Sequence, residues 1–180
     1  IDNTAPFIPV RIALLTVSDS RSLETDKSGQ TLVDRLCEAG HHLADRMILP
    51  DERDQIAAQL RAWIARQDVD VVMSTGGTGL TGRDVTVEAH KDVYEKEIQA
   101  FGTVFTMISM QKIGTSAVQS RATAGVSGGT YLFALPGSPG ACRDAWDEIL
   151  AKQLDFRHRP CNFVEIMPRL MESGFGGRQS

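Results

Sequence analysis

The stretch that decides the fold is VDVVMSTGGTGLTGRDVT, residues 69–86. Its first five residues form an apolar run of strand length, and four glycines follow within the seven positions 76–82. Glycine allows backbone N–H groups to approach a ligand closely and tolerates positive φ. The adjoining Arg83-Asp84 pair adds a carboxylate that suits a metal ion held on a phosphate. Because a strand–turn–helix junction of this kind binds anions, the stretch predicts a nucleotide or another phosphorylated ligand.

Strands and helices alternate on both sides of this stretch. Apolar runs of strand length predict strands at residues 11–18 and 41–49, and residues 121–126 and 130–135 predict a hairpin around Ser127-Gly128-Gly129. Alternation with short links favours a three-layer α/β/α domain with a mostly parallel central sheet. We expect an N-terminal arm at residues 1–9, the domain at residues 10–165 and a flexible tail at residues 166–180.

Helix starts and apolar stripes predict the helices. A helix before Gly40 carries Leu32, Val33 and Leu36 on one face. Asp51 is the expected N-cap of a second helix. Thr86 is the expected cap of a long helical region that runs to about Met110. Ser138 is the expected N-cap of a last helix, which has Pro139 at its first position. In the second helix, the residues expected to face the core are Ile56, Leu60, Trp63 and Ile64. In the helix that begins after Ser138, they are Cys142, Ala145, Trp146, Ile149 and Leu150.

Composition restricts the class of protein. A length of 180 residues suits one domain, and a net charge of −4 argues against a nucleic-acid surface. The three cysteines are far apart and indicate reduced thiols in a cytosolic protein. No apolar run is long enough to span a membrane. We therefore expect a cytoplasmic protein with neither nucleic acid nor membrane as a partner.

The predicted strands direct four loops to one edge of the sheet. These loops follow Val17, Leu49, Met73 and Leu135, and ligands of such sheets bind at the carboxyl ends of the strands. Asp51 and Asp84 lie on two of the loops, and one or two carboxylates with phosphate oxygens are a preferred ligand set for Mg²⁺. The arrangement predicts a magnesium ion that bridges the protein and a phosphorylated ligand.

Each of these features also has a purely structural interpretation. Asp51 and Asp84 suit helix starts on electrostatic grounds alone, and the loops at residues 18–21 and 136–140 suit ordinary turns. Ser109 and Ser120-Arg121 belong to a polar patch that either binds ligand or caps helices. Residues 77–82 match the dinucleotide fingerprint G-x-G-x-x-G, but they follow the third strand rather than the first, which argues against a dehydrogenase. The four histidines show no ligand spacing, and we interpret them as structural or exposed.

Together these motifs resemble the MoaB/MogA family of molybdenum cofactor biosynthesis proteins. The resemblance runs from about Val10 to Phe163 and rests on Thr-Val-Ser-Asp at residues 16–19, Gly-Gly-Thr-Gly at 76–79, Arg-Asp-Val-Thr at 83–86 and Pro-Gly-Ser-Pro at 136–139. The start at residues 7–12 and the end at residues 159–163 are most similar to the MoaB branch. The resemblance implies a molybdopterin-binding domain that adenylylates molybdopterin with Mg-ATP and releases pyrophosphate.

The resemblance also implies roles for individual residues. Asp51 and Asp84 correspond to the two aspartates of the catalytic members and are the expected metal ligands, although some MoaB-branch proteins lack the first of them. Val87 departs from the family, where proline is usual, and affects only the first helical turn. The predicted nucleotide and phosphate contacts are Gly76, Gly77, Thr78, Gly79, Arg83, Pro136, Gly137, Ser138 and Pro139, and the predicted pterin contacts are Ser18, Asp19, Arg21, Ser109, Ser120 and Arg121.

The resemblance further implies a homo-oligomer, a trimer or a hexamer, and a molybdenum-inserting enzyme as a further partner. The alternative function is a paralogue that binds or carries molybdopterin without catalysis. The glycine loop and the aspartate pair are compatible with both, and Asp51 is the residue that favours the enzyme.

Overall fold

One mixed sheet organises residues 1–172, the part of the chain that this computed structural model describes. Its strand order is β2-β1-β3-β6-β5-β4. Strands β2, β1, β3 and β6 are parallel neighbours, whereas β5 runs antiparallel to both β6 and β4. The strands are β1 (Arg11–Val17), β2 (His42–Leu49), β3 (Val71–Thr75), β4 (Lys96–Glu97), β5 (Thr123–Ser127) and β6 (Thr130–Leu135). The mostly parallel sheet that the sequence predicts is thus confirmed.

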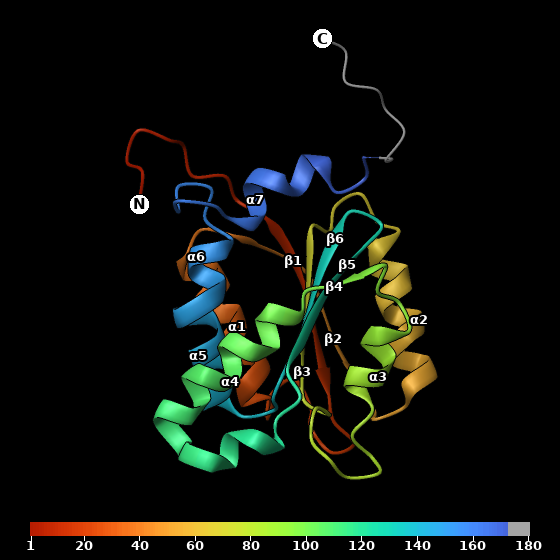
Figure 1. Ribbon diagram of the computed structural model, residues 1–180. Helices are drawn as coiled ribbons and strands as arrows, with labels where there is room; N and C mark the ends of the chain where they lie inside the picture. The colour runs from red at the N-terminus through yellow and green to blue at the C-terminus, as the bar shows by residue number, and fades with distance from the viewer. Residues whose placement is uncertain (173–180) are drawn as a thin grey trace.

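Helices cover both faces of this sheet (Figure 1). One face carries α1 (Lys27–Glu38), α4 (Gln99–Ile113), α5 (Pro139–Ala145) and α6 (Ala151–Gln153), and the other carries α2 (Arg53–Ile64) and α3 (Thr86–Lys91). A π-helical segment, η2 (Trp146–Leu150), connects α5 to α6, and a 3-10 helix, η1 (Gly114–Gln119), follows α4. The predicted three-layer α/β/α architecture is therefore confirmed.

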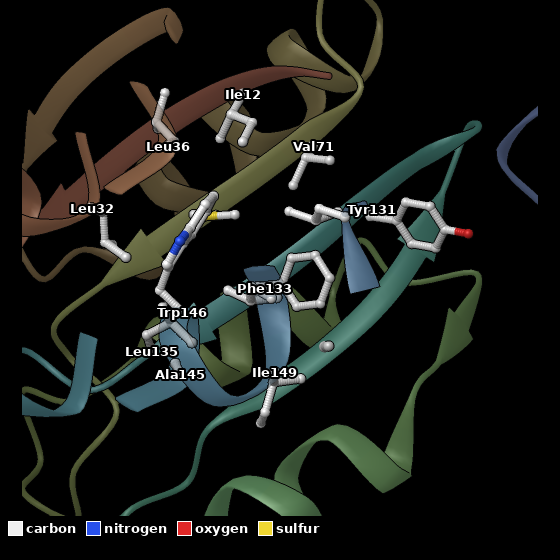
Figure 2. Packing of buried hydrophobic residues seen from close by; sticks show 14 of the residues in the cluster. Ile12, Leu32, Leu36, Val71, Tyr131, Phe133, Leu135, Ala145, Trp146 and Ile149 are labelled. Atoms are coloured by element: carbon white, nitrogen blue, oxygen red, sulfur yellow. The ribbon is translucent and has the colours of Figure 1, made fainter. Parts of the chain in front are cut away.

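Two hydrophobic cores follow from the alternation of side chains along the buried strands. Ile12, Val71 and Phe133 point toward the α1–α4–α5 side, where they pack with Leu36 and Trp146 (Figure 2). The intervening strand residues pack against α2 and α3; they include Ala13, Leu15, Val72 and Leu132, which meet Ile56, Leu60 and Trp63. Because both faces are covered, these strands appear in the sequence as continuous apolar runs.

The predicted hairpin and the predicted helix start at Ser138 are both confirmed. The β5–β6 hairpin turns at Gly128 and Gly129, whose φ angles are 55° and 80°. Ser138 is the N-cap of α5, since its Oγ accepts from the Ala141 N–H at 3.1 Å, and Pro139 occupies the first position.

The long helix predicted from Thr86 to about Met110 is wrong. The chain leaves helix α3 after Lys91, pairs Lys96 and Glu97 with β5, and enters helix α4 at Gln99. Tyr94 packs directly over Gly125, where an added Cβ would lie 2.4 Å from the tyrosine Cδ1. Residues 87–98 contain neither glycine nor proline, so the break arises from tertiary pairing that outweighs local helix propensity.

The predicted caps at Asp51 and Thr86 are also wrong. Glu52 and Val85 occupy the N-cap positions of α2 and α3, and neither makes a side-chain cap hydrogen bond. The Asp51 carboxylate is consequently not used to start a helix.

The N-terminal residues lie away from the loops at the carboxyl ends of the strands (Figure 1). Residues 1–9 contain no helix or strand. Residues 163–165 of the expected domain and Ile166 of the expected tail form α7 (Phe163–Ile166). The next tail residues form a 3-10 helix, η3 (Met167–Arg169), and Met167 and Leu170 pack against the core. Residues 173–180 of the expected tail lie outside the described residues. No helix within residues 1–172 has the length and apolar character needed to cross a membrane.

Candidate active site

Two hollows lie on either side of the glycine loop, which we define as residues 76–79. The first has a volume of about 300 Å³, and the second about 430 Å³. Gly77, Asp84 and Gly137 line both hollows. The first is also lined by Val17, Ser18, Asp19, Ser20, Arg21, Asp51, Thr75 and Gly76, and the second by Thr78, Gly79, Ser116, Gln119, Ser120 and Pro136. The four loops that the sequence directs to this edge of the sheet therefore meet there.

The glycine loop presents only part of its backbone to a ligand. Gly76 donates its N–H to the Leu135 carbonyl at 3.0 Å, and the Gly77 carbonyl accepts from the Thr86 N–H at 3.0 Å. Within residues 1–172, the N–H groups of Gly77 and Thr78 have no hydrogen-bond acceptor. These two donors, rather than the whole loop, are available to an anion.

Gly76 also fixes how closely the loop approaches β1. Its φ is 97°, and an added Cβ would lie 2.3 Å from the Val17 carbonyl oxygen. We expect Gly76→Ala to lower the free energy of unfolding by about 3 kcal/mol, because it combines backbone strain with a clash against the main chain. For a chain of this size that corresponds to a fall in Tm of roughly 6–12 °C.

Gly82→Ala is the matched control for Gly76→Ala. A Cβ at Gly82 meets nothing within 4 Å, and Gly82 is not among the glycines with positive φ. Its Tm is expected to stay within about 2 °C of the parent, since exposed substitutions without special contacts change stability by under about 0.5 kcal/mol. Equal melting temperatures of the two variants would contradict this account of the loop.

Asp84 is held as a carboxylate. Its Oδ2 atom accepts from the Thr81 N–H at 2.9 Å and from the Thr81 hydroxyl at 2.7 Å, which leaves Oδ1 for other partners. Burial opposes ionisation, but these hydrogen bonds, the Gly79 N–H and the charge of Arg121 outweigh it, so the pKa of Asp84 lies below its usual value. Asp84 is therefore ionised near neutral pH.

Asp51 has the opposite electrostatic environment. Burial raises its pKa, and the neighbouring carboxylates of Asp19 and Asp84 raise it further. Its Oδ1 lies 2.8 Å from where a Cβ of Gly77 would stand, and among residues 1–172 no group donates a hydrogen bond to its side chain. The charge of Arg83 opposes this shift without cancelling it, so Asp51 brings an excess of negative charge to the glycine loop.

This pair of carboxylates fits a magnesium ion. Residues 1–172 contain no group of three or more His, Cys, Asp or Glu side chains that could hold a metal by themselves. Mg²⁺ is commonly bound through one or two carboxylates, with phosphate oxygens and waters completing its shell. Burial and the charges of Asp19 and Asp84 raise the pKa of Asp51, and a divalent cation would relieve both effects. The buried Thr86 hydroxyl, which has no hydrogen-bond partner among residues 1–172, adjoins the same face of Gly77.

Arg83 spans the loops that follow β1 and β2. Its guanidinium donates to Asp19 at 2.9 Å and to Glu52 at 3.2 Å. Asp19 in turn accepts from the Asp51 N–H at 3.1 Å. Arg83 therefore holds the loop after β1 next to Asp51, and the sequence did not single out Glu52 as its second partner.

Arg21 and the loop at residues 136–139 form the opposite wall. Arg21 donates to the Ser28 hydroxyl at 2.9 Å and to the Gly137 carbonyl at 3.4 Å. The Pro136 carbonyl accepts from the Thr75 hydroxyl at 2.9 Å. Ser18 accepts from the Arg21 N–H at 3.2 Å, so the wall is linked by hydrogen bonds from β1 to β6.

Three of the predicted pterin contacts, Ser109, Ser120 and Arg121, do not line the first hollow, which the other three line. Ser109 is buried in α4 and lines neither hollow. Ser120 lines the second hollow, whereas the guanidinium of Arg121 contacts Gly79, Asp84 and Glu88 of the protein itself. Ser116 and Gln119 line the second hollow but were not among the predicted contacts. Ser116 belongs to the polar patch before β5, and Gln119 directly precedes Ser120 of that patch.

His90 takes no part in either hollow. It is buried and its Nε2 lies 2.8 Å from the Ser74 hydroxyl, while its Nδ1 lies 3.2 Å from the Tyr94 hydroxyl. Burial lowers its pKa to about 3, so the ring is neutral. The structural interpretation is confirmed for this histidine.

Comparison with known proteins shows the family of this chain. The profile of a family described as a probable molybdopterin binding domain matches residues 13–155. Molybdenum cofactor biosynthesis protein B of Escherichia coli (strain K12) is 55% identical over 157 residues, which cover 87% of this chain and 92% of that protein. The protein of the same name from Bacillus subtilis (strain 168) is 44% identical over 151 residues, which cover 83% of this chain and 88% of that protein.

Solved structures give the same result. A crystal structure of a molybdenum cofactor biosynthesis protein B has a TM-score of 0.82 and 41% identity, covering 91% of this chain and 96% of that chain. The tungsten cofactor synthesizing protein MoaB from Pyrococcus furiosus has a TM-score of 0.75 and 32% identity, covering 93% of this chain and 100% of that chain. The chain therefore belongs to the molybdopterin-binding domain family, in its MoaB/MogA group.

Proposed function

We propose that this chain adenylylates molybdopterin with Mg-ATP and releases pyrophosphate. Its relatives are proteins of molybdenum cofactor biosynthesis, and the chain acts in the same process. The observation that supports the catalytic step is the pairing, beside one glycine loop, of Asp84 with a lowered pKa and Asp51 with a raised one. Two such carboxylates suit a cation that accompanies a nucleotide.

The chemistry of this step requires little acid–base assistance. A phosphate oxygen of molybdopterin attacks the α-phosphorus of ATP, the bond between that phosphorus and the bridging oxygen breaks, and pyrophosphate leaves with the electron pair. Because the nucleophile is already anionic, no general base is needed. The barrier lies in bringing anions together and in stabilising the charge that develops on the phosphates.

The residues divide between the two substrates. The N–H groups of Gly77 and Thr78 would bind phosphate oxygens, with Gly76 and Gly79 shaping the loop. Arg83 adds positive charge to the phosphate region, and Pro136, Gly137, Ser138 and Pro139 border the adenosine. Ser18, Asp19, Arg21 and Ser120 are the proposed pterin contacts. Asp51 and Asp84 would hold Mg²⁺, which neutralises phosphate charge when bound.

We also propose that the chain works as a cytoplasmic homo-oligomer, a trimer or a hexamer, and passes its product to a molybdenum-inserting enzyme. The apolar surface of α4 and η1 supports self-association. Exposed side chains there are Val104, Met107, Met110, Ile113 and Val118. Apolar patches of this kind commonly mark protein contacts.

The decisive experiment is a turnover assay on the purified protein with molybdopterin, ATP and Mg²⁺. We expect adenylylated molybdopterin and pyrophosphate in equal amounts, separated by chromatography. The competing function, binding without catalysis, is favoured by the engagement of Arg83 with two carboxylates, which leaves less of its charge for phosphate. Calorimetric binding of molybdopterin with no product after prolonged incubation would select that function instead.

A further inference from the structure

Arg121 connects three parts of the chain through one planar group. It lies between η1 and β5, and its Nε donates to the Gly79 carbonyl at 2.9 Å. Its Nη2 donates to the Asp84 carbonyl at 3.2 Å, and its Nη1 is paired with the Glu88 carboxylate in the first turn of α3. The side chain is 29% exposed. The guanidinium is thus directed toward the protein rather than toward an approaching ligand.

The two carbonyls that Arg121 binds are the two ends of the turn at residues 79–84. Within this turn, the Asp84 N–H donates to the Thr81 carbonyl at 3.1 Å, and the Asp84 carboxylate accepts from Thr81. Its tip extends into solvent, where Leu80 is 67% exposed. Among residues 1–172, Arg121 is the residue that donates hydrogen bonds to the carbonyls of Gly79 and Asp84.

These contacts determine how the turn faces the site. In a planar trans peptide the carbonyl and the following N–H point in opposite directions. Carbonyls drawn toward Arg121 therefore direct the N–H groups of Leu80 and Val85 away from it. Arginine alone has a rigid fork of donors that can hold two carbonyls and a carboxylate at once, whereas lysine offers a single point charge.

We propose that Arg121 is a positioning residue, which orients Asp84 and the glycine loop through the carbonyls of Gly79 and Asp84. Glu88 holds the guanidinium in this position, and Arg121 in turn lowers the pKa of Glu88. In this proposal Arg121 positions the turn, whereas the sequence predicts that it contacts the pterin. Its effect on turnover rests on the proposed adenylyl transfer, whereas its effect on the turn does not.

The test has one arm that is independent of turnover. Hydrogen exchange followed by mass spectrometry is measured on peptides that cover residues 79–86 of the full chain. We expect Arg121→Ala and Arg121→Lys each to speed exchange there at least about tenfold, because the turn opens more often. Glu88→Gln keeps an acceptor oxygen but loses its charge, so a smaller acceleration in the same peptides is expected.

Arg53→Ala is the matched control, since Arg53 makes a two-bonded ion pair with Asp92 at the other end of α3 and does not touch the turn. Exchange in residues 79–86 is expected to match the parent in this variant. Unchanged exchange in both Arg121 variants and in Glu88→Gln would overturn the proposal. Should Arg121→Ala not fold, Arg121→Lys and Glu88→Gln still decide the result.

Kinetics separate positioning from ligand contact. We expect kcat to fall at least about tenfold in Arg121→Lys, while the Kd for molybdopterin, measured by calorimetry, stays within about twofold. A Kd raised tenfold with an unchanged kcat would instead make Arg121 a pterin contact. If the parent protein itself shows no turnover, the proposed function fails, and the exchange measurement alone decides the role of Arg121.

Discussion

Asp84→Asn is expected to fold like the parent and to lose adenylyl transfer by about 100-fold or more. An asparagine whose amide oxygen replaces Oδ2 still accepts both hydrogen bonds from Thr81. Its NH2 group then occupies the position of Oδ1, where it offers a donor in place of a ligand for Mg²⁺. Because Asp84 is ionised in the parent, the substitution removes a full charge from the point where phosphate charge must be balanced.

The measurement is the rate of product formation at saturating ATP and molybdopterin across a titration of Mg²⁺. The expected variant binds molybdopterin with nearly the parent Kd but shows little turnover at any magnesium concentration. Asp54→Asn is the control, since it makes the same change of charge on the first turn of α2, and its rate is expected to equal that of the parent. A rate for Asp84→Asn within threefold of the parent would remove Asp84 from the proposed mechanism.

The architecture could be predicted because its strands are buried on both faces. Continuous apolar runs such as residues 12–15 are typical of such strands, and parallel strands bring their following loops to one edge. Asp51 and Asp84 were therefore predicted to lie near each other although they are 33 positions apart, and both line the first hollow. The glycine loop was predictable for the same reason, because it directly follows such a strand.

The remaining features depend on contacts that a single sequence does not encode locally. The helix break between Lys91 and Gln99 results from pairing with β5, which lies about 30 positions further along the chain. Arg121 was predicted as a pterin contact from the family resemblance and from the polar patch that it shares with Ser120. A pattern of residue types does not tell which way a guanidinium points. The buried position of Ser109 in α4 does not follow from the sequence, which predicts one longer helix from Thr86 to about Met110 in place of α3 and α4.

Asp51→Asn is expected to lose turnover by about 100-fold or more and, unlike most substitutions in the site, to stabilise the protein. Burial and the charges of Asp19 and Asp84 raise the pKa of Asp51 above the usual value of 3.8. A carboxyl with a raised folded-state pKa binds its proton more tightly in the native state than in the unfolded state. The free energy of unfolding therefore decreases as pH rises from the unfolded pKa through the folded pKa, and the penalty persists at neutral pH.

Asparagine at residue 51 removes this penalty together with a ligand of the proposed magnesium ion. Relief of surface charge repulsion commonly contributes about 0.5–2 kcal/mol, which corresponds to a rise in Tm of roughly 1–8 °C for a chain of this size. Thermal unfolding without Mg²⁺ at pH 7 measures this gain, and it should shrink as the pH falls through the raised folded-state pKa of Asp51, where the parent carboxyl becomes protonated. Adding Mg²⁺ and ATP should raise the Tm of the parent more than that of the variant, because a ligand stabilises only the state that binds it.

Asp54→Asn again provides the comparison, and here the two variants are expected to change Tm in opposite directions. Asp54 lies in the first turn of α2, where a negative charge is favoured by the helix dipole by about 0.3–1 kcal/mol. Its loss should lower Tm slightly, although the change of charge is identical. A stability gain at residue 51 that coincides with lost turnover would show that the fold retains a destabilising carboxylate for its chemistry. A variant at residue 51 that is less stable than the parent at pH 7 would contradict the repulsion among Asp19, Asp51 and Asp84 on which the magnesium site is argued.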